Sequence, residues 1–364
     1  MFYILLLLIV CLVSYSVSSG GSNYSLRLKS TYYLFLSIVL VFVPALQFGI
    51  GTDYFSYADM YDNEGLALEN IRYKGEYFFY YLIVILKHAS LHHQFLFVFV
   101  SLFQMLLFFN LLRLLERNGY NIFIIVFVYF VVSNMYHNQM NVLRAFLAVY
   151  AFLNSYLYFA EGKKIKGAFG LIVAILCHQS AILVFPFALF QKRITELVSF
   201  SPFFIYVAFS LIYILNVPSY VLEAIILKVA PFYAHYLSGN YGMEGGGIQV
   251  LLTKVYYLPI HFVFFYLLYK QRISLNYFSR ALLAGFVIFY PLFWYLFHMT
   301  FVVRFMYFGY FFSIVPCYFV LEYFLKRKCF LEGFVIMAFL FFPYAYKVVF
   351  SPAGEYSFQL IDIF

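Results

Sequence analysis

Runs of about 20 apolar residues recur along the whole chain, and they constrain its fold more than any other feature. Each run is long enough for a helix to cross the hydrocarbon core of a bilayer. A transmembrane β-barrel would instead show alternating segments of about ten residues, and this sequence does not alternate. Only 10% of the residues are charged, against about 25% in a soluble domain. The sequence therefore predicts an all-α polytopic integral membrane protein.

About ten of these runs are long enough to be full transmembrane helices. The first run has no basic segment before it, so we expect a retained span rather than a cleaved signal peptide. We treat residues 1–364 as a single transmembrane domain. The expected spans are 2–19, 32–50, 95–112, 120–136, 142–160, 200–216, 251–269, 280–298, 305–325 and 330–350.

Short basic segments lie between the apolar runs and indicate which side each loop faces. Lys and Arg concentrate in cytoplasmic loops of membrane proteins, so we expect these segments on the cytoplasmic side. They also account for most of the net charge of +8, which therefore gives no indication of nucleic-acid binding. The segments contain Arg27/Lys29, Arg113/Arg117, Lys163/Lys164/Lys166, Lys192/Arg193, Lys270/Arg272 and Lys326/Arg327/Lys328.

Two apolar stretches must not cross if every basic loop is cytoplasmic. Residues 77–94 are short and end in polar residues, and 167–190 have basic residues on both sides. We expect both to be re-entrant or broken helical hairpins, which are tolerated where protein or a water-filled cavity covers the backbone. The loops 51–76 and 217–250 then face outward, as do both termini. The alternative, in which one or both stretches cross and the positive-inside rule is locally broken, gives up to 12 spans.

Arg144 and Arg304 lie near the outer ends of two predicted spans. A guanidinium in a bilayer is costly, so such residues usually face a cavity and a partner. The alternative is that each side chain snorkels to the headgroups. The positive-inside rule disfavours arginine on the outer face. Two arginines there therefore indicate a functional role. That role would be bidentate binding of a phosphate or carboxylate.

His178 is the one histidine within 167–190, and Gln179 and Ser180 follow it. Its imidazole is either part of a local hydrogen-bonded network or a general base acting near neutral pH. Both interpretations stay open on the residues alone.

Asp53, Tyr54 and Tyr57 lie in an outward-facing turn rich in acids and aromatic rings. Ring faces stack on the C–H patches of sugars while carboxylates accept hydroxyl protons, so this composition fits a sugar-binding surface. The alternative is an interfacial aromatic belt with solvated acids.

The sequence gives no sign of a metal or cofactor. The four cysteines lack metal-like spacing, and His88, His92 and His93 have no acidic or cysteine partner that the sequence reveals. Walker A and Rossmann glycine patterns are absent. Any chemistry must therefore use a substrate that is already activated, and a lipid-linked donor at the outer face fits this requirement.

Four segments in order along the chain resemble the EpsG family of bacterial exopolysaccharide proteins, which belongs with the Wzy-type O-antigen and capsule polymerases. They read "GTDYFSYADMYD", "NVLRAFLAVYAFLNSYLYFAEGKKIKGAFGLIVAILCHQSAILVFPF", "YAHYLSGNY" and "RFMYFGYFF". The resemblance covers about 40–320, and the block from Arg144 to His178 is its most specific part. Family members commonly carry "RxGxGTDY", whereas this chain has Gln47 and Phe48 before the glycines, which puts more of the anion binding on Arg144 and Arg304.

The resemblance implies a GT-C-like glycosyltransferase in the bacterial cytoplasmic (inner) membrane. It would join undecaprenyl-pyrophosphate-linked oligosaccharide repeat units at the outer face, in O-antigen, capsule or exopolysaccharide biosynthesis. Arg144 and Arg304 would bind the pyrophosphate, and His178 first or Asp53 second would be the base for the acceptor hydroxyl. No metal is demanded, because arginines can stabilise the departing charge. The residues that would line the sugar path are Tyr54, Tyr57, Tyr233 and Tyr236.

The implied partners are the lipid bilayer, the lipid-linked sugars, and a flippase and chain-length regulator of the same pathway. The main alternative is that the chain is itself a transporter or flippase of lipid-linked oligosaccharides. Such a protein should show internal repeats or paired broken helices in its two halves. A scaffolding subunit of an export complex is a third possibility, but it leaves Arg144 and Arg304 unexplained.

Overall fold

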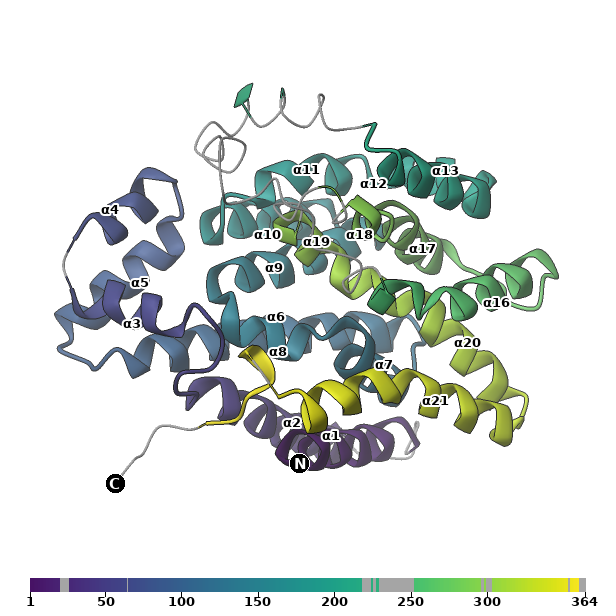
Figure 1. Ribbon diagram of the computed structural model, residues 1–364, viewed down its shortest axis with the longest axis horizontal. Helices are drawn as coiled ribbons and strands as arrows, with labels where there is room; N and C mark the ends of the chain where they lie inside the picture. The colour runs from purple at the N-terminus through teal and green to yellow at the C-terminus, as the bar shows by residue number, and fades with distance from the viewer. Residues whose placement is uncertain are drawn as a thin grey trace. The chain divides into compact units, whose positions relative to one another are not determined.

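The computed structural model is helical throughout the parts of the chain that it describes (Figure 1). These are residues 1–19, 26–63, 65–217, 252–295, 303–352 and 354–359, with the isolated positions 224, 227, 228 and 298. No β-strand occurs within them, so the all-α prediction is confirmed there. The chain forms two compact units, which are described separately: Met1–Ile182 with Phe324–Phe364, and Leu183–Tyr323.

The first unit is a bundle around α9, whose apolar residues are buried on nearly all sides. α6 and α10 pack along α9, α2 packs on α6, and α1 packs on α7. Its helices are α1 Phe2–Ser19, α2 Leu26–Ala45, α3 Tyr54–Asp62, α4 Leu66–Tyr73, α5 Tyr77–His88, α6 Gln94–Arg117, α7 Ile122–Val128, π-helical η2 Tyr129–Ser133, α8 Met135–Asn141, α9 Leu143–Ala160, α10 Lys164–Cys177, α21 Phe330–Ala345, π-helical η6 Tyr346–Phe350 and η7 Gly354–Tyr356.

The second unit contains shorter helices and is rich in aromatic packing. α17 is its most central helix and contacts α12, α13, α18 and α19. The helices are α12 Gln191–Phe200, α13 Pro202–Ile214, α16 Leu258–Tyr269, α17 Tyr277–Phe289, α18 Leu292–Tyr295, α19 Val303–Tyr310 and η5 Phe311–Ser313, while α11 Ala181–Leu189 and α20 Ile314–Lys326 straddle the two unit boundaries.

α9 and α10 lie unusually close together because small residues line their contact. A Cβ added at Gly170 would lie 3.0 Å from the Cβ of Ser155, and one at Gly167 would lie 2.9 Å from the Phe159 ring. The Ser155 hydroxyl also donates a hydrogen bond to the Gly167 carbonyl. Small residues allow such close approach of apolar helices. The two helices therefore form a firm antiparallel pair.

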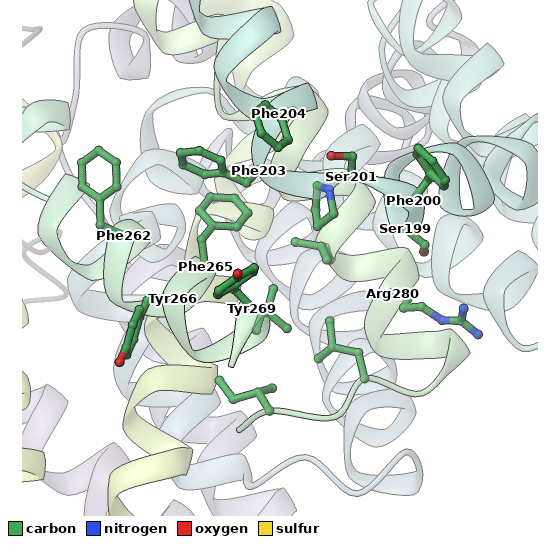
Figure 2. Close-up of a pocket in the computed structure, with 15 residues that line it drawn as sticks. Ser199, Phe200, Ser201, Phe203, Phe204, Phe262, Phe265, Tyr266, Tyr269 and Arg280 are labelled. Carbon is green, nitrogen blue, oxygen red and sulfur yellow. The ribbon is translucent and has the colours of Figure 1, made fainter. Parts of the chain in front are cut away.

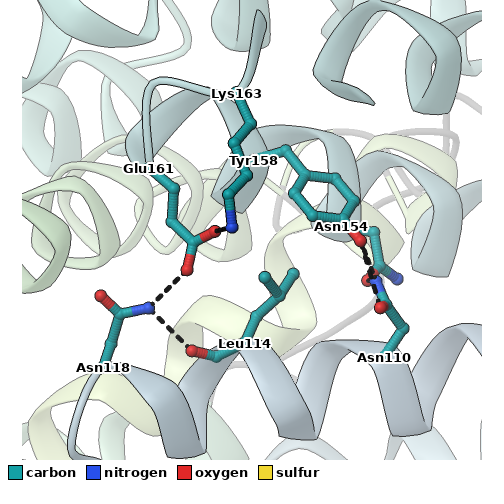
Figure 3. Close-up of polar contacts among 7 residues, drawn as sticks. All are labelled: Asn110, Leu114, Asn118, Asn154, Tyr158, Glu161 and Lys163. Atoms are coloured by element: carbon teal, nitrogen blue, oxygen red, sulfur yellow. Dashed lines mark hydrogen bonds and ion pairs between the residues drawn. The ribbon is translucent and has the colours of Figure 1, made fainter. Parts of the chain in front are cut away.

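Polar contacts fix the alignment of α6 and α9. Figure 3 shows Asn110 on α6 facing Asn154 and Tyr158 on α9. The Asn110 amide donates to Asn154 Oδ1 (2.6 Å) and to the Tyr158 hydroxyl (2.8 Å). Beside the α9–α10 turn, the Asn118 amide donates to the Glu161 carboxylate (2.8 Å). A sliding movement of one helix would leave these groups unsatisfied, so the contacts specify one register.

Six helices in the described ranges are long and apolar enough to cross a membrane, or up to eight if each of two bent pairs is one span. The prediction of about ten full spans is therefore not confirmed. The six are Gln94–Arg117, Leu143–Ala160, Leu252–Tyr269, Tyr277–Tyr295, Phe305–Lys326 and Phe330–Phe350.

The predicted spans that fall short do so for local reasons. In 120–136 a π-helical turn and the left-handed Asn134 bend the helix by 55°. In 200–216, Ser201 and Pro202 separate α12 from α13 with a bend of 104°. The first two predicted spans correspond to α1 Phe2–Ser19 and α2 Leu26–Ala45, whose apolar parts with described side chains are Phe2–Ser18 and Ser30–Ala45.

The two stretches expected not to cross are short or broken. Residues 77–94 contain α5, of 12 residues. Residues 167–190 are interrupted at His178–Ser180, where α10 ends and α11 begins. The short helix in 77–94 and the break in 167–190 fit the expectation that neither stretch is a continuous span. Their re-entrant course and the side that they face stay predictions. The outward loop predicted over 217–250 lies, after its first residue, almost entirely outside the described residues.

Candidate functional site

Three helix ends meet in the first unit and bring an acid, an arginine and a histidine together. Glu76 immediately precedes α5, Arg144 is the second residue of α9, and His178 immediately follows α10. α9 and α10 are antiparallel neighbours, so the start of one lies beside the end of the other. α5 packs on α10, which brings Glu76 to the same place.

The Glu76 carboxylate is the buried centre of this cluster. Its side chain is 2% exposed, and that of Arg144 is 21% exposed. Arg144 Nη1 donates a hydrogen bond to Glu76 Oε2, and the backbone N–H of Gln179 donates to Oε1 across 3.4 Å. An unpaired buried carboxylate would cost several kcal/mol. The opposite charge of Arg144 is what allows Glu76 to be ionised here.

The pKa of the Glu76 carboxyl lies below its ordinary value. Burial raises this pKa, but the charge that His178 carries when protonated, the positive charge of Arg144 and the Gln179 N–H lower it by more. The acid is therefore an anion at neutral pH, and the ion pair with Arg144 is its stable form.

Two aromatic rings hold the Arg144 guanidinium. Its Cζ lies 5.8 Å from the centre of the Tyr57 ring and 5.7 Å from that of Phe79. Both rings are buried, and contact between a cation and an aromatic ring is stronger where water is excluded. The rings and Glu76 together restrict the guanidinium to one orientation.

His178 has its Nδ1 lone pair already in use. Nδ1 accepts a hydrogen bond from the Ser180 backbone N–H (3.1 Å) and lies 2.9 Å from the Ser180 hydroxyl. A backbone N–H can only donate, so in this contact the ring is neutral with its proton on Nε2. Nδ1 also lies 3.6 Å from Glu76 Oε1. A proton taken up at Nδ1 would therefore be stabilised by the carboxylate, at the cost of the Ser180 N–H bond.

The turn that carries Asp53 is tied to the end of α8, close in sequence to Arg144. Asn141 Oδ1 accepts hydrogen bonds from the backbone N–H of Thr52 (2.8 Å) and of Asp53 (3.1 Å). Gly51 has φ +78°, and a Cβ there would collide with the Asn141 side chain. Only glycine fits both conditions. The Gly-Thr-Asp sequence therefore holds this turn against the end of α8.

Comparison with protein-family models gives one match, the EpsG family, over residues 30–361. The chain belongs to the EpsG family. Membership indicates a membrane protein with a polymerase-like part in polysaccharide biosynthesis. No curated protein and no solved structure matches the chain.

In this member of the EpsG family, two of the four tyrosines predicted to line the sugar path are buried. Tyr57 is buried beneath Arg144, and Tyr54 is buried with its ring stacked on Phe97 at 4.6 Å. The Tyr54 hydroxyl donates to Gln94 (3.3 Å). Both rings are therefore committed to packing in this structure, and a role in sugar binding stays a prediction for each.

Arg304 belongs to α19, but its side chain lies outside the described parts of the structure. Tyr233 and Tyr236 also lie outside the described residues. Their predicted roles stay predictions.

One expectation about the histidines is wrong. The sequence reveals no acidic partner for His88, His92 or His93, yet His93 Nδ1 lies 2.8 Å from the Asp62 carboxylate. Within the described residues, however, no three His, Cys, Asp or Glu side chains are grouped so that they could hold a metal ion.

Sequence reasoning missed Glu76, the central residue of the site. A weak signal was present, because Glu76 is the last acid before the apolar stretch 77–94. Nothing local shows that its partner is Arg144, which is 68 residues away in the sequence.

Two buried polar atoms beside the ion pair make no hydrogen bond within the described structure. They are Nε of Arg144, a donor, and Oε1 of Gln179, an acceptor. Buried polar atoms normally have partners, so these two are candidates for contact with a bound molecule that supplies both an acceptor and a donor.

Proposed function

We propose that this protein is a polysaccharide polymerase of the bacterial inner membrane. It joins undecaprenyl-pyrophosphate-linked oligosaccharide repeat units at the outer face, for O-antigen, capsule or exopolysaccharide. Family membership and the many apolar helices support the general class. The single observation that carries the proposal is the buried Arg144, held in one orientation by Glu76, Tyr57 and Phe79.

An oriented guanidinium suits a reaction whose leaving group is a pyrophosphate. As the bond between the donor sugar and the pyrophosphate breaks, negative charge grows on the phosphate oxygens. Fixed donors aimed at developing charge lower the barrier because they need not reorganise during the reaction. Arg144 has five N–H donors, of which Glu76 accepts one through Nη1. The remaining donors, including the unpaired Nε, would bind the pyrophosphate, with Arg304 as the second cation.

Glu76 reduces the net charge of the site, so its role is to position Arg144 rather than to bind the anion. A lone buried arginine would either move towards water or lose most of its orientation. With Glu76 and the Tyr57 and Phe79 rings around it, the guanidinium is held in one orientation.

The base for the acceptor hydroxyl must have a free lone pair and be reachable by the sugar. The Nδ1 lone pair of His178 already accepts from Ser180. Asp53 is only half-buried, and its carboxylate makes no capping bond to α3. We therefore place Asp53 ahead of His178 as the base, which reverses the order that the sequence alone suggests.

The reaction transfers the growing chain to the incoming unit. The acceptor hydroxyl oxygen forms a bond to C1 of the terminal sugar, while the bond from C1 to the pyrophosphate oxygen breaks. The hydroxyl proton goes to the Asp53 carboxylate, and undecaprenyl pyrophosphate leaves with the electron pair.

One observation favours the transporter alternative. The structure contains two broken apolar helix pairs, α7–η2 with α8 and α12 with α13, and broken helices are frequent in transporters. The two functions predict different products. A reconstituted polymerase converts lipid-linked repeat units to longer chains and releases undecaprenyl pyrophosphate, whereas a transporter only moves them across the vesicle membrane.

Purified protein in vesicles, supplied with lipid-linked repeat units on both faces, tests the proposal. We expect a ladder of longer chains and one released undecaprenyl pyrophosphate per bond formed. Movement of units without chain growth would instead support the transporter.

A further inference from the structure

The second unit contains a groove of about 700 Å³ that the proposed function does not use. α12, α13, α16 and α17 and the segment between α16 and α17 form its walls. Figure 2 shows Phe262, Phe265 and Phe203 gathered in one part of the groove, with Arg280 on the opposite side. The groove is thus apolar along most of its length and cationic at one end.

The apolar walls are open rather than packed against other helices. Phe200, Phe204, Phe262, Tyr266 and Tyr269 line the groove and are all exposed. In a chain that spans a membrane, exposed rings of this kind face lipid, and Tyr and Trp are common at the level of the headgroups. Such walls fit a hydrocarbon chain.

Three exposed basic side chains lie in or beside the groove. Arg280 lines the groove, while Lys270 and Arg272 flank the lining residues Tyr269 and Ile273. Lys270 Nζ lies 5.5 Å from the centre of the Tyr269 ring, which places this charge against the groove wall. Among the residues that the structure describes, no acidic side chain lines the groove. These three basic side chains outnumber the exposed Glu196, which lies near Tyr277 as Arg280 does. The net charge beside the groove therefore complements an anion.

α12 places the groove at a membrane surface. It is amphipathic and bends by 104° into α13. On its exposed side it carries Lys192, Arg193 and the single acid Glu196, together with the apolar Leu197 and Phe200. A short helix with exposed cations and exposed apolar residues lies in the plane of the interface. The basic residues assign this interface to the cytoplasmic side by the positive-inside rule.

We propose that this groove binds an anionic glycerophospholipid of the cytoplasmic leaflet. Its phosphate contacts Arg280 and Lys270, and an acyl chain lies along Phe262, Phe265 and Phe203. A zwitterionic lipid would bring its own cation next to these residues, so the charge favours a net anionic headgroup. The lipid-linked sugars of the proposed polymerase react at the other face, so the site is separate from that function.

Photolabelling tests the proposal in the full-length protein. The probe is phosphatidylglycerol with a diazirine in one acyl chain, added to purified protein in neutral detergent. Labelled peptides should contain 199–204 or 262–275. Unlabelled phosphatidylglycerol should compete, and phosphatidylcholine should compete much less. The combined variant Arg280→Gln and Lys270→Gln should need roughly 25-fold more phosphatidylglycerol to halve the labelling, because each basic residue near an anionic surface contributes about fivefold.

A matched control removes two exposed cations from the first unit, Arg117→Gln with Lys164→Gln, and should leave the competition unchanged. Equal loss in both variants would mean that only net charge matters, and the site would be refuted. Equal competition by phosphatidylcholine, or labelling of other peptides, would also refute it. Competition by polyprenyl phosphate but not by phosphatidylglycerol would assign the groove to the polyprenyl carrier instead. Because all four positions are exposed, both variants should fold, which their elution volume and helical circular dichroism check.

Discussion

Arg144 and Glu76 form a buried ion pair at the junction of three helix ends in the first unit. Glu76 immediately precedes the short helix α5, and Arg144 is the second residue of the largely buried helix α9. The pair therefore connects segment 51–76 to the core of the first unit. Breaking it should affect both stability and activity, and the two effects can be separated.

Glu76→Gln should destabilise the protein by about 3–5 kcal/mol, because it leaves the charge of Arg144 buried without a partner. Thermal unfolding in detergent, followed by circular dichroism, measures this. Glu69→Gln is the matched control: it removes an acid from the same segment, but one that pairs with Arg72 in an exposed position. Its unfolding midpoint should stay within experimental error of the wild type. Equal shifts in the two variants would contradict the ion-pair interpretation.

Removing both charges separates stability from function. The combined variant Glu76→Gln with Arg144→Gln should recover much of the stability that Glu76→Gln loses, since no uncompensated charge remains. It should still make no polymer, because the pyrophosphate has lost its oriented donor. Polymer at the wild-type level from a stable double variant would remove Arg144 from the proposed mechanism.

Arg144→Lys should keep the protein folded but lower the rate of polymerisation by about 10²–10³-fold. The charge is retained, while the planar donors that match phosphate oxygens are lost. Chain length on a gel, from cells that express the variant at the native level, reports the loss. Arg117→Lys makes the same change at an exposed position in a predicted basic loop and should give a normal ladder.

The two candidate bases can be distinguished by a pair of variants. Asp53→Asn should abolish the ladder while single capped units persist, because a general base contributes about 10²–10⁴-fold. His178→Gln should leave a reduced ladder, since Gln can still accept from the Ser180 N–H. Asp59→Asn is the control, because Asp59 is an exposed acid of α3, the helix that Asp53 precedes. A normal ladder from Asp53→Asn and none from His178→Gln would restore His178 as the base.

Much of the site could be predicted from the sequence because α9 and α10 follow each other directly. The run after Arg144, the Gly162 turn and the run back to His178 indicate an antiparallel pair whose outer ends meet. The partner Glu76 could not be predicted, because hydrophobic patterns identify helices without saying which helix ends come together. The Ser-Pro sequence at 201–202 is typical of a helix start, but the predicted span 200–216 did not anticipate the 104° bend between α12 and α13.

Acidification should destabilise the protein through Glu76. Its pKa in the folded protein lies below the ordinary value of 4.5, so its contribution to stability is complete above about pH 4.5. That contribution is lost as the pH falls through the lower, folded-state pKa. The unfolding midpoint of the wild type should therefore fall more steeply below pH 4.5 than that of Glu76→Gln. Parallel curves for the two proteins would show that Glu76 is not the group responsible.

Gly51→Ala should disconnect the Asp53 turn from α8. Gly51 has φ +78°, a conformation that costs an L-residue roughly 1–2 kcal/mol. Its new Cβ would also collide with Asn141, which holds the backbone N–H groups of Thr52 and Asp53. Gly75→Ala is a close control for the backbone strain, since Gly75 has φ +76° and its nearest neighbour for a Cβ is the Tyr77 ring at 4.0 Å.

Both glycine variants should therefore lose a similar amount of stability from backbone strain, and Gly51→Ala should lose more because of the collision. The activity should differ further, because only Gly51→Ala displaces the proposed base. Adding Asn141→Ala to Gly51→Ala removes the collision but also the two hydrogen bonds, so it should restore part of the stability and little of the polymer ladder. If Gly51→Ala and Gly75→Ala polymerise equally well, the tie between the Gly-Thr-Asp turn and Asn141 does not position Asp53 for the reaction.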